Sequence, residues 1–96
     1  MKTAPRFVLR LYVAGDGPHS ALAIVNLKAF CLAHLPERHE IEIVDVLTDQ
    51  RRALADGVML TPLLVKVSPT PVRRVVGTLS KLEPMLQALG LINSTS

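Results

Sequence analysis

The sequence predicts one mixed α/β domain whose elements follow the order β-α-β-α-β-β-α. Three observations support this prediction: apolar residues that alternate at every second position, apolar residues that recur with helical spacing, and turn residues between such segments. The chain has 96 residues, of which 49% are hydrophobic and 20% are charged. That length allows one hydrophobic core, and that composition excludes global disorder. We expect a single domain over 1–96 with an ordered core over about 6–92.

The first half of the chain predicts a strand, a helix and a second strand. Apolar residues alternate over 6–14, which indicates a strand. Helical spacing over 20–35 predicts a helix that Pro18 introduces and Pro36 ends. The β-branched segment 40–47 predicts a second strand, which is parallel to the first because a helix separates the two.

A short helix and a third strand are expected next. Thr48 or Asp49 can cap the helix, and Gly57 suits its end. The apolar segment 58–67 predicts a strand that Pro62 interrupts. In domains with the element order β-α-β-α-β-β-α, a proline before the third strand is typically cis. We expect Pro62 to have a structural role, in which it shapes a binding edge.

The last part of the chain predicts a strand and a closing helix. Residues 72–76 favour a strand that ends at Gly77. Ser80 and Glu83 have the spacing of a capping box, so Ser80 is expected to cap the helix. Gly90 is expected to end it.

These halves, βαβ and ββα joined by a helix, have the thioredoxin-like architecture βαβαββα. Oxidoreductases of this architecture need a cysteine where the first helix begins, because the helix dipole lowers the pKa of the thiol there. Residues 15–20 contain no cysteine, and the Ser20 hydroxyl is too weakly acidic to replace one. The single cysteine, Cys31, lies on the apolar side of the predicted helix and is expected to be buried. We therefore expect binding, with no catalytic residue.

Other site chemistry is also absent from the sequence. His19, His34 and His39 lack the spacing of metal ligands, and no glycine motif for a nucleotide is present. Aromatic residues make up 3% and the net charge of +3 is dispersed, which argues against nucleic-acid binding. No apolar run is long enough to span a membrane, and no signal peptide is visible. We expect a cytoplasmic protein without metal or cofactor.

Several segments resemble the KaiB family of circadian clock proteins. The most specific stretches are LTPLLVKV over 60–67 and PTPVRRVVG over 69–77. The segment LRLYVAG over 9–15 and the segment VDVL over 44–47 match as well, and Leu79–Ser80 continue the pattern. The resemblance covers nearly the whole chain.

This resemblance implies a non-enzymatic regulator that binds the hexameric ATPase-kinase KaiC and modulates its phosphorylation. Lys66, Arg73 and Arg74 match basic positions that affect KaiC binding in the family, although ordinary solvated charge is the simpler interpretation of each. Asp45 and Asp49 flank the end of the second strand and either contribute to the partner surface or cap the next helix, with capping favoured for Asp49.

The resemblance also implies a choice between two folds. KaiB proteins form the thioredoxin-like state βαβαββα and a tetrameric ground state βαββααβ. Residues 85–89 are strong helix formers. Ala88 stands where many members have glycine, and alanine is more favourable than glycine in a helix by ~1 kcal/mol. We therefore expect the thioredoxin-like state; the ground state would instead place 72–77 in a helix and 85–92 in a strand.

Departures from the family pattern bear on the partners. Thr78 and Lys81 replace acidic residues that are common there, and the net charge is +3. These departures favour a KaiC-type partner over dependence on KaiA, and they leave a clock role and a stress role open. Free sheet edges leave a dimer or a tetramer open as well. Two other hypotheses are an adaptor that resembles the sensor domain of a clock-associated histidine kinase and, with less support, a thiol oxidoreductase.

Overall fold

The computed structural model describes residues 6–92, and the two ends expected to be loose, 1–5 and 93–96, lie outside the described residues. The elements are β1 (Phe7–Val13), α1 (Pro18–His34), β2 (His39–Asp45), α2 (Gln50–Ala55), β3 (Leu63–Ser68), β4 (Arg73–Val76) and α3 (Leu82–Ala88). This order confirms the predicted thioredoxin-like architecture. The segment that the alternative fold would make helical is strand β4, and the segment that it would make a strand contains α3.

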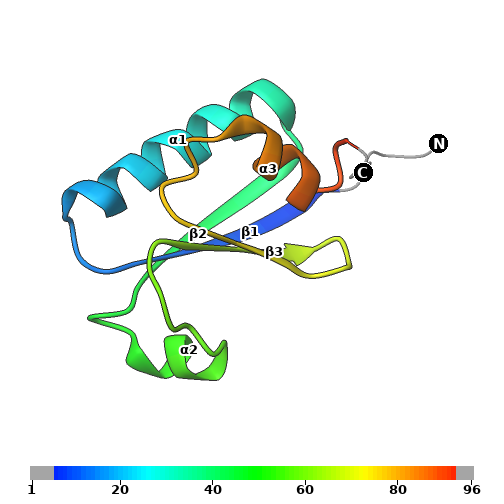
Figure 1. Cartoon of the computed structure of the whole chain (residues 1–96). Helices are drawn as coiled ribbons and strands as arrows, with labels where there is room; N and C mark the ends of the chain where they lie inside the picture. Colours follow the sequence, from blue (N-terminus) through cyan, green and yellow to red (C-terminus); the bar gives the residue numbers. More distant parts are fainter. Residues whose placement is uncertain (1–5, 93–96) are drawn as a thin grey trace.

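The strands form one sheet in the order β2-β1-β3-β4. β1 pairs with β2 in parallel, as the intervening helix predicted, whereas β3 is antiparallel to both β1 and β4. Helices α1 and α3 lie on one face of the sheet, and the short helix α2 lies on the other (Figure 1). Strands β2 and β4 are therefore the two edges.

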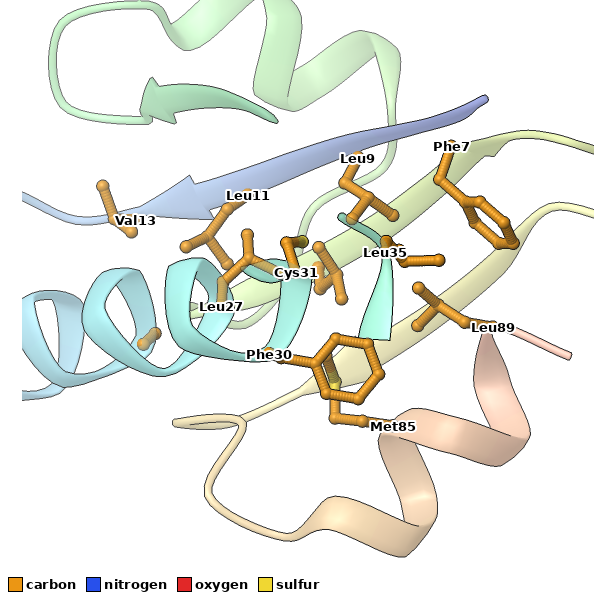
Figure 2. Close-up of a cluster of buried hydrophobic side chains, with 12 residues drawn as sticks. Phe7, Leu9, Leu11, Val13, Leu27, Phe30, Cys31, Leu35, Met85 and Leu89 are labelled. Carbon is orange, nitrogen blue, oxygen red and sulfur yellow. The ribbon is translucent and has the colours of Figure 1, made fainter. Parts of the chain in front are cut away.

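Alternation along β1 divides the interior into two cores. Leu9 and Leu11 point toward α1 and α3 and belong to the larger core (Figure 2). That core also contains Leu27 and Cys31 of α1 and Met85 of α3. Cys31 is fully buried, as predicted, and burial raises the pKa of its thiol to about 11.

The smaller core lies beneath α2. It is formed by buried residues from three neighbouring strands, namely Tyr12, Val44, Leu63 and Val65. Val58, which precedes β3, packs against this core. The prediction of a strand from 58 onward is therefore wrong: β3 begins at Leu63, and 58–62 form a loop whose apolar Val58 is explained by packing instead of strand pairing.

The capping box predicted at Ser80 is also wrong. Lys81 is the N-cap of α3, and no side chain caps this helix; the Ser80 hydroxyl instead lies 3.1 Å from Thr78 Oγ1. Pro84 explains why the helix begins one residue later than predicted. With Ser80 as the cap, residue 84 would be the first to donate its N–H within the helix, and proline has no N–H. At the other end, Gly90 adopts φ +72° just beyond the helix, as its predicted role as a stop requires.

Candidate interaction surface

Two arginines of the edge strand β4 lie on opposite faces of the sheet. Arg73 pairs in register with Lys66 of β3, and Arg74 pairs with Val65. Both arginines are exposed. The structure thus places Arg73 beside Lys66 on one face of the sheet and Arg74 on the other face.

Lys66 differs from its arginine neighbours in exposure. Only 4% of its surface is accessible, so the expectation of a solvated strand-face charge is wrong for this residue. Burial, together with the nearby positive charge of Arg73, lowers the pKa of its ammonium group. Lys66 is buried because β3 is an inner strand whose α1-facing positions are covered. Its neighbours on the two adjacent strands are Leu9 and Arg73.

Asp45 lies at the end of β2, on the opposite edge of the sheet from β4. Its Oδ1 accepts hydrogen bonds from the backbone N–H groups of Gly15, at 3.0 Å, and Leu47, at 2.9 Å. The structure therefore does not bring Asp45 together with the arginines, and its carboxylate fastens the loop before α1. Asp49 caps α2 by accepting from the Arg52 N–H at 3.4 Å, which confirms the role favoured for it.

Apolar side chains adjoin the arginines on the α2 side. Met59 is 90% exposed, Leu60 64% and Val76 56%. Together with Leu63 and Arg74, these residues line a cavity of about 160 Å³. We call the exposed residues Arg73, Arg74, Val76, Met59 and Leu60 the β4 surface. Exposed apolar side chains grouped beside charged residues are typical of binding sites on proteins.

Pro62 and Gly77 hold the loop of the β4 surface against the strand. Pro62 is buried at the start of β3 and its preceding peptide bond is cis. The Gly77 N–H donates to the Pro62 carbonyl at 2.9 Å. Gly77 has φ +112°, which side-chain-bearing residues rarely adopt. These two positions therefore fix where Met59 and Leu60 lie relative to Val76.

Arg74 is oriented by a hydrogen-bonded network below α2. Its guanidinium donates to the carbonyl of Asp56. The Asp56 carboxylate in turn accepts from the fully buried Tyr12 hydroxyl and, at 3.1 Å, from Arg10. The Tyr12 and Arg10 hydrogen bonds lower the pKa of Asp56, and burial is the main cause that raises the pKa of Tyr12.

Glu42 extends this network across the sheet to β2. It accepts from Arg10 Nε at 3.0 Å and from both terminal nitrogens of Arg52, one of them at 2.7 Å. The Arg52 and Arg10 hydrogen bonds lower the pKa of Glu42 to about 2. The sequence prediction missed this network, although the alternation of Arg10 and Tyr12 with the leucines of β1 indicates that they share the second face of the sheet.

The position where thioredoxin-like enzymes carry their cysteine has a different function here. The Ser20 hydroxyl is buried and lies within hydrogen-bond distance of both the N–H and the carbonyl of Ala14, at 3.3 and 3.4 Å. It fastens the start of α1 to the end of β1. Within 6–92, no three His, Cys, Asp or Glu side chains are arranged to hold a metal ion. No helix in this described part is long and apolar enough to cross a membrane.

Comparison with known proteins identifies related sequences over nearly the whole chain. The family model described as the KaiB domain matches residues 10–91. The circadian clock protein KaiB3 of Synechocystis is 38% identical over 87 residues, which cover 91% of this chain and 85% of the relative.

Solved structures of similar shape have the same fold at low sequence identity. The N-terminal domain of SasA from Synechococcus elongatus aligns with a TM-score of 0.75 at 19% identity, covering 100% of this chain and 94% of that domain. Mitochondrial thioredoxin 3 from Saccharomyces cerevisiae aligns with a TM-score of 0.67 at 14% identity, covering 90% of this chain and 76% of the thioredoxin. These structures support the thioredoxin-like fold, whereas the sequence match indicates the family.

Proposed function

Since the chain belongs to the KaiB family of non-enzymatic clock proteins, we propose that it binds a KaiC-type hexameric ATPase-kinase through the β4 surface and modulates the phosphorylation of that partner. The observation that carries this proposal is the match over 10–91, which includes both halves of the β4 surface. The residues of 60–67 and 69–77, on which the resemblance depends most, fold together there.

The physical properties of the β4 surface suit a protein partner. Its apolar side chains can be buried on contact, and burial contributes about 25 cal/mol per Å² of apolar area. Its arginines can pair with carboxylates and accelerate the encounter with an acidic surface. Hydrogen bonds from the loop and from α2 hold Arg74 and the apolar residues in place, so less entropy is lost on binding.

Size-exclusion chromatography with a KaiC homologue from the same organism, with and without ATP, tests the proposal. We expect the chain to co-elute with the hexamer, and an Arg73→Glu variant to co-elute less, especially at low salt. Lys28→Glu is the matched control, because it reverses an exposed charge on α1, away from β4. Failure of the natural chain to form a complex in both conditions would contradict the proposal.

A second candidate function is that of a stand-alone adaptor similar to the SasA N-terminal domain. The TM-score of 0.75 over the full chain supports this candidate. The sequence favours the first, since identity is 38% to KaiB3 and 19% to the SasA domain. Co-purification distinguishes the two candidates. An adaptor of a kinase should co-purify with a histidine-kinase core, whereas a KaiB-type regulator should bind the KaiC homologue without such a core.

A further inference from the structure

The free edge of β4 presents unpaired backbone groups. Within residues 6–92, β4 pairs only with β3. The hydrogen bond from Gly77 N–H to the Pro62 carbonyl shows which pairs of this antiparallel ladder are the hydrogen-bonded ones. Hydrogen-bonded and non-hydrogen-bonded pairs alternate in such a ladder, so Arg73 and Val75 direct their N–H and C=O groups toward β3. Arg74 and Val76 therefore direct theirs away from the sheet, where another strand can accept and donate.

A groove runs beside this free edge. A cavity of about 520 Å³ is lined by all four residues of β4 and by Pro84, Gln87 and Ala88 of α3. The smaller apolar cavity under Met59 and Leu60 lies on the opposite, α2-facing side of the same strand. A chain segment added at the edge thus finds space for its side chains on both faces of the sheet.

The charge of the edge indicates which segment fits. One arginine of β4 lies on each face, and neither cavity is lined by an Asp or Glu of the described part of the chain. Arg73 forms no ion pair or side-chain hydrogen bond with any residue that the structure describes, so its charge is available to a partner. Val75 and Val76, which follow the arginines, place one apolar side chain on each face of the sheet. Opposite charges and matched apolar residues directly across a strand pair stabilise it.

We propose that an extended acidic segment of the partner protein adds to the edge of β4 as an antiparallel fifth strand. This inference rests on the proposed function, because it specifies how the β4 surface binds its partner. Read in the partner's N-to-C direction, the segment has two apolar residues, opposite Val76 and Val75, followed by two acidic residues, opposite Arg74 and Arg73. Backbone hydrogen bonds give this mode of recognition its affinity, and alternate side chains give it specificity.

A peptide titration tests the strand addition directly. The probe is acetyl-Ser-Val-Ile-Glu-Glu-Ser-amide, and its control has Lys-Lys in place of Glu-Glu. In ¹H–¹⁵N NMR spectra at low salt, we expect the acidic peptide to shift the amides of Arg74 and Val76 most, and to bind at least about tenfold more tightly than the control. Equal binding of the two peptides, or shifts centred elsewhere, would overturn the inference.

A pair of variants separates backbone pairing from side-chain contact. Val76→Pro removes an outward-facing N–H and leaves the ladder to β3 intact, whereas Val76→Ala shortens the side chain and keeps that N–H. We expect Val76→Pro to weaken peptide binding about tenfold relative to Val76→Ala. Equal affinities of the two variants would refute pairing at this edge. Should Val76→Pro fail to fold, Arg73→Glu provides an independent test: it should shift preference toward the Lys-Lys peptide, and an unchanged preference would count against the inference.

The same variants distinguish this inference from the proposed function. If Val76→Pro binds the KaiC homologue as well as Val76→Ala does, the proposed function stands and strand addition is wrong. If the natural chain binds the acidic peptide at β4 but no KaiC homologue, strand addition stands and the partner class is wrong.

Discussion

The two faces of the sheet carry different kinds of side chain. The face under α1 and α3 is closed by apolar side chains from all four strands and from these two helices, and even the charged Lys66 on this face is buried. The face under α2 has a small apolar core flanked by a network of arginines and carboxylates. Helix α2 has six residues and leaves much of that face to charged side chains.

This difference separates stability from recognition. The closed face supplies the buried apolar area that favours folding. The charged face connects β2, α2 and β4 through Glu42, Arg52, Asp56 and Arg74, and so positions the surface assigned to the partner. Truncating apolar side chains on the first face should therefore cost more stability than removing one hydrogen bond or ion pair on the second.

The largest effect is expected from Leu27→Ala. Leu27 is fully buried in the larger core, and its truncation leaves a cavity that costs about 2–5 kcal/mol of the free energy of unfolding. Urea denaturation followed by circular dichroism measures the loss. Leu54→Ala is the control, because Leu54 lies on α2 and is exposed, and its truncation should change stability by less than about 0.5 kcal/mol. Similar losses for both variants would contradict the contrast between the faces.

Tyr12→Phe should have the next largest effect, and it acts on the charged face. The substitution removes the hydroxyl that donates to the Asp56 carboxylate, and hydrogen bonds to charged groups contribute about 1.5–3 kcal/mol. It should also raise the pKa of Asp56, since that hydrogen bond is the main cause of its lowered value. NMR titration of the Asp56 carboxyl in the natural chain and in the variant measures this change. An unchanged Asp56 pKa would show that Tyr12 does not stabilise the carboxylate.

Ala88→Gly should have a smaller effect, at the edge of the closed face. Ala88 is the last residue of α3, so glycine there should cost at most the about 0.5–1 kcal/mol of backbone entropy that it costs inside a helix. Because Ala88 also lines the groove beside β4, the variant tests whether a looser end of α3 disturbs that strand. We expect lower thermal stability and NMR line broadening confined to α3 and β4. Ala21→Gly, near the start of α1, is a comparison in a helix that does not line the groove.

The sequence predicted the element order because each element has a clear period or stop. The alternation in β1, the prolines that flank α1 and the glycine after α3 are local signals, and all three predictions are confirmed. The cap at Ser80 failed because a second local signal, Pro84, outweighed it. The strand expected at 58 failed because an apolar loop residue, Val58, packs against a core just as a strand residue does.

The candidate site was less predictable, because its contacts join distant residues. Arg10 and Asp56 are 46 positions apart, and Tyr12 and Asp56 are 44 apart, so no local pattern relates them. The burial of Lys66 depends on the position of β3 inside the sheet, which the order of elements alone does not specify. Arg73 and Arg74 could be singled out as neighbours in the chain, but only the ladder with β3 shows which of them meets α2.

The smallest effect is expected from Glu42→Gln, and it depends on pH. The pKa of Glu42 is lowered to about 2 in the folded chain, whereas an unfolded glutamate titrates near 4.3, so the unfolded state binds more protons between these values. The contribution of Glu42 is therefore complete above about pH 5 and is lost as the pH falls toward about 2. Because Glu42 is exposed, that contribution should be at most about 1 kcal/mol and should shrink in 1 M salt. We expect urea denaturation between pH 2 and pH 7 to show a shallower pH dependence for Glu42→Gln than for the natural chain. Equal slopes for the two proteins would mean that the Glu42 bridges to Arg10 and Arg52 do not stabilise the charged face.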